Sequence, residues 1–488
     1  MTITHVPPIR KLAKTRIVAT VGPASEDSAT LRELILSGVD IFRFNFAHGS
    51  HKWLGDILDR IREISRDIGI PVAVLGDLSG PKIRLGELPD EGVLCKENAV
   101  FEFVKGHPDT SGTQLTCTYD KLIDDVEEGD RILLADGTVS MLVTQKSDDG
   151  QSVRCLVVDA GRIRSRQGVN LPGVNLSTPS VTKKDEEDLK WALENSLDFI
   201  GLSFVRSAND IRHLRDLIEA ASPTVVPAIV AKIEKTEAVA DLDAIMEATD
   251  AIMVARGDLG VEAEITRVPI LQKDIIRSCN QRRIPVITAT QMLDSMQGNE
   301  LPTRAEVSDV ANAVIDGTDA VMLSGETAIG NNPVACVKMM ERICIQAEPL
   351  AARTELRDHL SHQSRKATPV TEAVAIGAVA VARELDADLI VVASQTGRTA
   401  LALSRQRSSV PILAVTHREA TARRMCLYWG VQSLESKLVR KSADALLQYV
   451  VEWGLENNVL RSGNRVVVVG RTNWLDAGQD LMMVHEVP

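Results

Sequence analysis

The sequence predicts an α/β protein whose largest part is a closed barrel of eight parallel strands, and two observations carry that prediction. First, eight short apolar segments recur along the first two thirds of the chain, and helical patterns separate most of them. Second, these segments are almost continuously apolar, as strands are when helices cover both faces of a sheet. The expected strands are 16–22, 41–47, 71–78, 199–205, 228–234, 251–258, 285–292 and 320–327. Eight such units are the number that closes a (β/α)8, or TIM, barrel.

The helix expected between the second and third strands illustrates the alternation. Its apolar residues follow the i, i+3, i+4, i+7 spacing of a helix with one buried face. They are Leu54, Ile57, Leu58, Ile61 and Ile64. Strand, helix and strand joined by short connections imply that the two strands pair in parallel.

The alternation stops between the third and fourth strands. Over residues 78–198 the sequence shows short strand patterns around turns such as Asp136-Gly137. We therefore predict a small β-barrel-like domain inserted after the third strand. Because the loop after a barrel strand opens at the C-terminal mouth, this domain is placed to act as a lid over a ligand.

The pattern changes again near residue 350, where helices and strands alternate in a way typical of an open α/β sandwich. The predicted domains are the first part of the barrel (1–80), the inserted lid (81–170), the second part of the barrel (171–349) and a C-terminal regulatory α/β domain (350–488).

The composition excludes some classes of protein. A formal net charge of −12 disfavours nucleic acid and anionic membranes as partners, because both repel an acidic protein. No segment approaches the roughly 18 uninterrupted apolar residues of a membrane span, and the N-terminus has no apolar core typical of a signal peptide. The 7 cysteines show no C-x-x-C spacing and are expected to be reduced thiols. We expect a cytoplasmic protein with no nucleic-acid or membrane partner.

Polar residues gather where the apolar strands end. Lys232 and Glu234, at the end of "AIVAKIE", lie two residues apart and so share one face of their strand. Five of the strand ends carry such a pair. A solvated end or a structural ion pair would explain one strand, but not their recurrence at the same end around a ring. The residues are Arg43 with Asn45, Asp77, Ser203, Lys232 with Glu234, Arg256 with Asp258, Thr288 with Thr290, and Ser324 with Glu326.

The charges of this ring indicate its chemistry. Glu234 and Asp258 offer hard oxygen ligands on neighbouring strands, which suit Mg²⁺. Lys232, Arg256 and Arg43 are expected to surround that metal with fixed positive charge. Two carboxylates, three cations and a divalent ion describe a site for a highly anionic ligand such as a phosphorylated carboxylic acid.

Longer motifs give the chain a family resemblance. In order, it contains "TRIVATVGPAS", "FRFNFAHG", "GDLSGPKIR", "GVNLPG", "AKIE", "IMVARGDLGVE", "ITATQMLDSM", "PTRAEVSDVANAVIDGTDAVMLSGETA" and "SQTGRTA". The chain resembles the pyruvate kinase family over nearly its whole length. The resemblance implies a glycolytic phosphotransferase that moves the phosphoryl group of phosphoenolpyruvate to ADP, giving pyruvate and ATP. Catalysis of this kind consists mainly of positioning and charge stabilisation.

The resemblance also implies residue roles. Lys232 would stabilise the transferring phosphoryl group and the developing enolate, and Arg43 would contact the phosphate. Glu234 and Asp258 would hold Mg²⁺, with Mn²⁺ as a substitute. The backbone of Gly257 and Asp258 would bind the substrate carboxylate.

Thr290 would join the carboxylate site, and proton delivery to enolpyruvate is expected near it through water. The nucleotide site implied by the family consists of Arg84, Asn45, His48 and Pro23.

Two lysines that approach the nucleotide in many relatives are replaced here by Gln167 and Ile329, which leaves the nucleotide preference open.

The monovalent-cation site of the family is altered. Many relatives bind K⁺ with an asparagine, a serine hydroxyl, an aspartate and a carbonyl, near a glutamate. The matching residues here are Asn45, Ala47, Asp77 and Leu78, and Lys82 stands at the glutamate position. An ammonium at Lys82 would supply the charge of K⁺ and repel the ion, so K⁺ is not expected to be required. The alternative is a solvated loop lysine.

The C-terminal "SQTGRT" resembles the loop that binds a phosphorylated activator in the family. Its candidate residues are Ser394, Thr396, Gly397, Arg398 and Thr399. A plain strand-to-helix turn is the alternative. The resemblance further implies an allosteric enzyme and a homotetramer.

Two other functions remain open from the sequence. One is a non-catalytic sensor of a phosphorylated metabolite, which the changes at Gln167 and Ile329 would suit. The other is a different Mg²⁺-dependent barrel enzyme that acts on an oxo-acid enolate.

Overall fold

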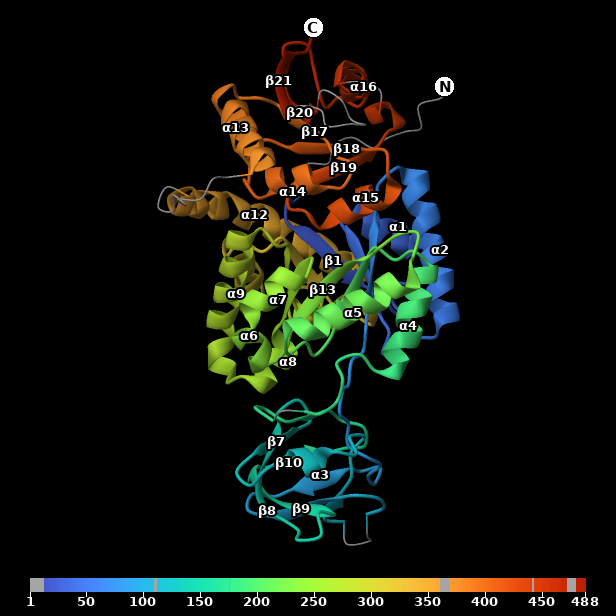
Figure 1. Cartoon of the computed structure of the whole chain (residues 1–488), viewed down its shortest axis with the longest axis vertical. Coiled ribbons are helices and arrows are strands. Elements are labelled where there is room, and N and C mark those ends of the chain that lie inside the picture. The colour runs from blue at the N-terminus through green and yellow to red at the C-terminus, as the bar shows by residue number, and fades with distance from the viewer. Residues whose placement is uncertain (1–12, 109–111, 175, 360–368, 441–442, 472–479) are drawn as a thin grey trace.

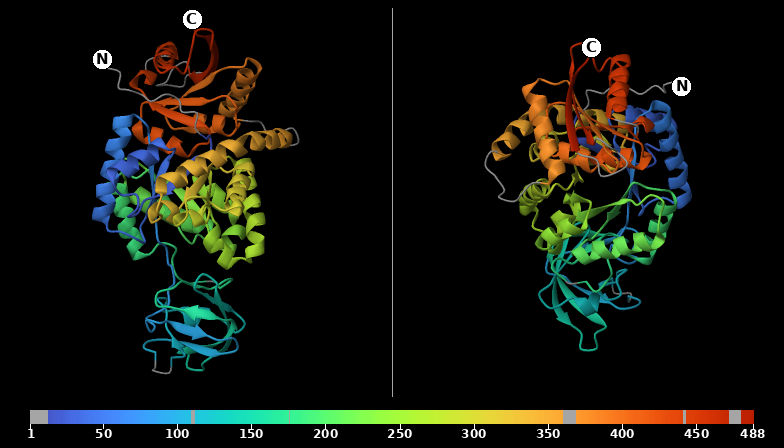
Figure 2. Two further views of the ribbon diagram at one scale, coloured as in Figure 1. Left: turned by 180° about the vertical axis from the view of Figure 1, so that it is seen from behind. Right: turned by 45° about the horizontal axis from the view of Figure 1, so that its top comes forward.

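The computed structural model describes residues 13–108, 112–174, 176–359, 369–440, 443–471 and 480–488. Three bodies lie along the long axis of the molecule (Figure 1). The barrel is in the middle, the inserted β-domain lies beyond one end of it and the C-terminal α/β domain beyond the other. The additional views in Figure 2 show the same order. The predicted fold class is therefore confirmed.

The barrel is closed, and every neighbouring pair of its strands is parallel. Its strands are β1 (Arg16–Thr20), β2 (Ile41–Asn45), β3 (Ala73–Asp77), β12 (Phe199–Leu202), β13 (Ala228–Ile233), β14 (Ala251–Ala255), β15 (Val286–Ala289) and β16 (Ala320–Leu323). They follow one another around the barrel in the order β1-β16-β15-β14-β13-β12-β3-β2. All eight predicted strands exist, but each ends earlier than the sequence indicated.

The difference matters most at β14. The predicted strand ran to Asp258, whereas β14 ends at Ala255 and helix α8 (Arg256–Glu262) begins at once. Arg256 and Asp258 are therefore helical residues and do not share a strand face as predicted. The backbone there forms bonds along the helix instead of across the sheet, and residues two apart on a helix point in different directions.

Helices surround the barrel. They are α1 (Ser28–Leu36), α2 (His51–Ile68), α4 (Lys183–Glu194), α5 (Ala208–Ala221), α6 (Thr236–Ala240), α7 (Leu242–Ala248), α8, α9 (Val268–Arg282), α10 (Arg304–Ile315), α11 (Gly325–Ala328) and α12 (Pro333–His359). Helix α2 shows why they form. Ser50 caps its first turn by accepting a hydrogen bond from the Trp53 amide, and Gly69 ends it in the left-handed conformation at φ 68°. Its five predicted apolar residues are all buried.

The inserted domain is an antiparallel-rich β-domain with its own core. Its elements are β4 (Val93–Cys95), β5 (Val100–Val104), β6 (Gln114–Leu115), α3 (Leu122–Asp125), β7 (Arg131–Leu134), β8 (Val139–Lys146), β9 (Ser152–Asp159), β10 (Gly161–Ile163) and β11 (Val169–Asn170). The predicted turn at Asp136-Gly137 joins β7 to β8, with positive φ angles of 54° and 82°. Aspartate and glycine tolerate this left-handed region better than most residues, which is why they mark the turn.

The C-terminal domain has a five-stranded sheet in the order β19-β18-β17-β20-β21. Its elements are α13 (Val370–Glu384), β17 (Leu389–Ala393), α14 (Arg398–Ser404), β18 (Ile412–Thr416), α15 (Glu419–Arg424), β19 (Val431–Glu435), α16 (Ala443–Glu456), β20 (Arg465–Arg471) and β21 (Asp480–Glu486). The sequence analysis did not find the two outer strands, β19 and β21.

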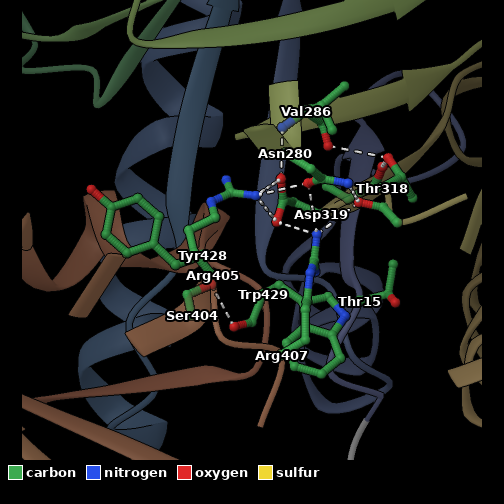
Figure 3. A network of polar contacts seen from close by, with 12 residues as sticks. Thr15, Asn280, Val286, Thr318, Asp319, Ser404, Arg405, Arg407, Tyr428 and Trp429 are labelled. Atoms are coloured by element: carbon green, nitrogen blue, oxygen red, sulfur yellow. Dashed lines mark hydrogen bonds and ion pairs between the residues drawn. The ribbon is translucent and has the colours of Figure 1, made fainter. Parts of the chain in front are cut away.

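A buried ionic cluster joins this domain to the barrel (Figure 3). Arg405 Nη1 lies 3.0 and 2.9 Å from the two carboxylate oxygens of Asp319, and Arg407 Nη2 lies 3.0 Å from Oδ1. Asp319 also accepts the Val286 amide at 2.8 Å. Because Asp319 precedes β16 and Val286 begins β15, the cluster fixes the domain to the end of the barrel opposite its mouth.

Across the described residues, no helix is both long enough and apolar enough to cross a bilayer.

Candidate active site

A chain of ion pairs crosses the mouth of the barrel at the ends of β2, β3 and β13. Arg43 donates from Nε to Asp77 Oδ2 at 2.7 Å, and its Nη2 lies 2.6 Å from the same oxygen. Lys232 Nζ lies 3.2 Å from the other oxygen, Asp77 Oδ1. Asp77 is only 1% exposed, so a single buried carboxylate holds both cations at a fixed separation. Although burial alone would raise the pKa of Asp77, Lys232 and Arg43 lower it below its ordinary value.

Lys232 is also paired with the carboxylate that follows its own strand. Its Nζ lies 2.9 Å from Glu234 Oε1, as their shared direction predicted. Burial alone would lower the pKa of Lys232, but the charges of Asp77 and Glu234 outweigh burial and raise it. The ammonium is therefore a permanent positive charge at the mouth of the barrel.

A residue without a predicted role completes the lysine's surroundings. Lys232 Nζ donates to Ser203 Oγ at 2.6 Å, and Ser203 in turn donates to the Leu78 carbonyl at 2.7 Å. The sequence signal for Ser203 was its place at the end of the fourth strand, but the spacing alone did not reveal its contact with Lys232. Ser203 orients the ammonium without adding charge.

Glu234 is suited to bind a further cation. It is 1% exposed, and its Oε2 accepts the Phe204 amide at 2.7 Å. Burial raises its pKa first of all; the neighbouring Asp258 carboxylate raises it further, while Lys232 lowers it. The anion is thus only partly compensated by the lysine. A divalent metal shared with Asp258 would remove the repulsion between the two carboxylates.

The donor set fits a metal of the Mg²⁺ type. Glu234 and Asp258 are hard oxygen donors, and Mg²⁺ keeps several waters and accepts ligand oxygens in its remaining positions. Within the described ranges, no group of three or more histidine, cysteine, aspartate or glutamate side chains forms a closed metal cage. An open two-carboxylate site is consistent with a metal that also binds substrate.

Thr290 and the first turn of α8 form the next part of the site. Gly257 donates its backbone N–H to Thr290 Oγ1 at 2.8 Å, and the threonine hydroxyl donates to the Ala289 carbonyl at 2.6 Å. Thr290 has φ 69°, which is a strained conformation for a β-branched residue. The surrounding hydrogen bonds hold it there and bring its hydroxyl against α8.

Arg256 does not belong to the predicted group of cations around the metal ligands. Its Nη1 lies 2.7 Å from Asp309 of α10, and its Nη2 and Nε donate to the carbonyls of Thr290 at 2.7 Å and Ala289 at 3.2 Å. The prediction was wrong because the chain has already entered α8 at residue 256, which turns this side chain toward α10. Arg256 supports the Thr290 segment instead.

Two residues of the altered monovalent-cation site lie next to each other, but Lys82 contacts Asp258 and not these two residues. Asn45 and Asp77 lie side by side on β2 and β3. Lys82 Nζ lies 3.6 Å from Asp258 Oδ1, across the junction between the inserted domain and α8. The ammonium therefore stands beside a predicted metal ligand.

The predicted nucleotide residues come from two bodies. Pro23 and His48 lie in exposed barrel loops, and Asn45 is the last residue of β2. Arg84 lies on the inserted domain, where its Nη1 donates to the Arg166 carbonyl at 3.1 Å. For these described residues, the structure contains no hydrogen bond or ion pair between Arg84 and the barrel loops.

Neither of the two positions at which many relatives have a nucleotide-binding lysine has a charged side chain in this chain. Gln167 accepts the Arg164 amide through Oε1 at 2.6 Å, and Ile329 is 66% exposed.

The candidate effector loop connects β17 to α14. Gly397 has φ 83°, and its N–H donates to Ser394 Oγ at 3.0 Å. Ser394, Thr396, Arg398 and Thr399 line a cavity of about 530 Å³. The cavity is also lined by two arginines that the sequence analysis did not select, Arg283 and Arg405.

These features define a barrel enzyme with a cationic, carboxylate-bearing mouth suited to a phosphorylated acid and a divalent metal. The sequence matches the family descriptions "Pyruvate kinase, barrel domain" over residues 12–337 and "Pyruvate kinase, alpha/beta domain" over residues 372–485. The chain belongs to the pyruvate kinase family and is a phosphotransferase.

Individual relatives agree with this assignment. The pyruvate kinase of Geobacillus stearothermophilus is 41% identical over 478 residues, covering 97% of this chain and 80% of the relative. "Pyruvate kinase 2" of Synechocystis sp. is 43% identical over 478 residues, covering 97% and 79%. The crystal structure of a pyruvate kinase from Cryptosporidium parvum superposes with a TM-score of 0.91 at 34% identity, covering 98% of this chain and 96% of that one. The family works on phosphoenolpyruvate, ADP, pyruvate and ATP and requires a divalent metal.

Proposed function

We propose that this pyruvate kinase transfers the phosphoryl group by using Lys232 as a fixed positive charge beside a Mg²⁺ held by Glu234 and Asp258. The observation that carries the proposal is the 2.9 Å contact between Lys232 Nζ and Glu234 Oε1 inside the mouth of the barrel. Pyruvate formation from phosphoenolpyruvate, measured with and without ADP, tests it. No product would indicate a sensor, and product without ADP would indicate another enolate enzyme.

The proposed role of Lys232 is electrostatic. Charge develops on the phosphoryl oxygens and then on the enolate, and a desolvated ammonium stabilises both more strongly than water would. Arg43 binds the phosphate and is held in place by Asp77, which leaves its Nη1 within 3.2 Å of Thr20. When bound, the divalent metal neutralises phosphate charge and orients the substrate oxygens; Mn²⁺ is the expected substitute.

The substrate carboxylate is proposed to bind the backbone of Gly257 and Asp258 together with the Thr290 hydroxyl. The 2.8 Å contact between Gly257 N and Thr290 Oγ1 supports a common site for the three groups. The proton that converts enolpyruvate to pyruvate is proposed to arrive through water near Thr290.

K⁺ is proposed to be unnecessary for activity. The Lys82 ammonium, 3.6 Å from Asp258, would bring one positive charge to the edge of the metal site. Asn45 and Asp77 remain from the family's cation site, but a second cation close to Lys82 would be repelled.

ADP is proposed to bind between Arg84 on the inserted domain and Pro23, Asn45 and His48 on the barrel, so that movement of the inserted domain as a lid would close the site. Because Gln167 and Ile329 replace two lysines of many relatives, the metal and Arg84 would have to neutralise more of the negative charge of the diphosphate.

A phosphorylated effector is proposed to activate the enzyme from the loop containing Ser394, Thr396, Gly397, Arg398 and Thr399. The hydroxyls and guanidinium that line the cavity of about 530 Å³ support an anionic ligand of metabolite size.

A homotetramer is proposed from the family alone. A cytoplasmic location and the domain boundaries 1–80, 81–170, 171–349 and 350–488 are proposed from the composition and pattern of the sequence.

A further inference from the structure

Helix α8 is held by the inserted domain at both of its ends. Its first turn carries Gly257 and Asp258, and its last residue is Glu262. The inserted domain joins the barrel through two connections. Lys82, in the first connection, lies 3.6 Å from Asp258. Asn170, in β11 just before the second connection, donates from Nδ2 to Glu262 Oε1 at 3.0 Å.

The contact at Glu262 is part of a buried three-residue cluster. Lys235 Nζ donates to the same Oε1 at 2.7 Å, and the side chains of Lys235 and Glu262 are 5% and 1% exposed. Lys235 directly follows Glu234. The cluster therefore connects the inserted domain, the last turn of α8 and the residue after a predicted metal ligand.

The two contacts of Glu262 differ in how they respond to movement of the inserted domain. Lys235 and Glu262 both belong to the barrel, so their ion pair persists when the inserted domain moves. The Asn170 amide belongs to β11 and must move with that domain. A hydrogen bond from an amide to a carboxylate depends steeply on distance and angle, so rotation of the domain would break this bond while the Lys235 ion pair remains.

Both hydrogen bonds to the Glu262 carboxylate are accepted by the same oxygen, Oε1. The other oxygen, Oε2, is buried and has no hydrogen-bond partner in the described part of the chain. Loss of the Asn170 amide would leave a buried carboxylate satisfied by Lys235 alone. That loss carries a penalty which favours the orientation of the inserted domain in which the amide is present.

We propose that Asn170, Glu262 and Lys235 form a latch that couples the orientation of the inserted domain to the position of α8. The three are positioning residues: they touch no reacting atom in the proposed mechanism and act through Asp258 and Gly257 at the other end of the helix. The orientation that seats the Asn170 amide on Glu262 holds α8 where its first turn serves substrate and metal. This inference rests on the proposed function of Gly257 and Asp258.

The test compares Asn170→Ala with the wild-type protein and with Ser177→Ala. Ser177 is the matched control because it also ties the second connection to the inserted domain, through its amide and hydroxyl at 2.9 and 3.0 Å from Asp125 Oδ2, without touching α8. Hydrogen–deuterium exchange of peptides covering residues 256–262 is measured on the ligand-free proteins, followed by steady-state kinetics.

We expect N170A to accelerate exchange in α8 and S177A to leave it at the wild-type rate. In N170A the KM for phosphoenolpyruvate and the Mg²⁺ concentration for half-maximal activity should each rise by about tenfold, a change of about 1.4 kcal/mol, while kcat changes by less than about threefold. A residue that only stabilised the fold would not separate KM from kcat in this way.

Unchanged exchange in α8 of N170A would overturn the latch, as would equal acceleration in S177A. A rise confined to the KM for ADP would show that Asn170 tethers the inserted domain without positioning α8, and would also overturn it. If N170A melts well below the wild type, Asn170→Leu, which keeps the branched shape of the side chain without its amide, is measured instead. Exchange is independent of turnover, so the latch can be judged even if the proposed catalytic roles fail.

Discussion

Lys232 Nζ lies 2.9 Å from Glu234 Oε1, and both side chains are almost completely buried at the mouth of the barrel. The pair places a permanent positive charge beside a carboxylate that is itself destabilised by burial. In a stable fold such a pair contributes little net free energy, because desolvation of two ions offsets their attraction. The pair is therefore better explained by function than by stability: the ammonium would bind an anionic ligand, and the carboxylate would bind a metal.

Metal binding should weaken as the pH falls. Burial and the Asp258 charge raise the pKa of Glu234, so protons compete with the metal at a higher pH than they would at an ordinary glutamate. Below the folded pKa of Glu234, the apparent affinity should fall by about tenfold per pH unit. Mn²⁺ binding measured by electron paramagnetic resonance across the acidic range checks this. An affinity that stays constant down to the ordinary range of glutamate would contradict the raised pKa.

The wild-type enzyme should show no large stimulation when K⁺ replaces tetramethylammonium at constant ionic strength. Lys82→Glu should create a K⁺ requirement, because the ammonium beside Asp258 is replaced by a carboxylate that attracts a cation. Turnover of both proteins in the two salts is the measurement, and Lys190→Glu, at an exposed position of α4, serves as a charge-matched control. Strong K⁺ stimulation of the wild type would eliminate the proposed role of Lys82.

The ionic cluster between the barrel and the C-terminal domain should be important for stability. Asp319→Asn leaves Arg405 and Arg407 buried without their carboxylate, and breaking a buried pair in this way costs about 3–5 kcal/mol. Denaturant unfolding of the variant gives the change in the free energy of unfolding. Arg32→Ala breaks an exposed pair with Asp67 and should cost less than about 1 kcal/mol. Equal decreases in the free energy of unfolding for the two variants would show that the buried cluster contributes no more to stability than an exposed ion pair.

Much of the fold was predictable because its signals are local. Strand β13 is apolar from Ala228 to Ala231, before the charged residues at its end, and the apolar face of α2 follows helical spacing. Both properties depend on neighbouring residues alone. The outer strands β19 and β21 escaped prediction. Each lies at an edge of its sheet, where exposed positions interrupt the apolar pattern that marks an inner strand.

The sequence predicted most of the residues that form the site, but not the direction of every side chain. Glu234 points with Lys232 because both lie at a strand end, where alternation holds. The prediction for Arg256 was wrong because the expected strand extended a few residues too far. In the structure Arg256 lies in α8, and its side chain pairs with Asp309. The contact between Lys82 and Asp258 joins distant parts of the chain, and no local pattern encodes it.

The most direct test of the central claim is the turnover of Lys232→Met under saturating phosphoenolpyruvate, ADP and Mg²⁺. Lys190→Met, which removes an exposed ammonium of α4, is the control, and circular dichroism checks that both variants fold. We predict that K232M loses nearly all phosphoryl transfer while K190M retains wild-type activity. If folded K232M kept more than about a tenth of wild-type turnover, the loss would be under about 1.4 kcal/mol, and Lys232 could not be the charge that stabilises the transferring group.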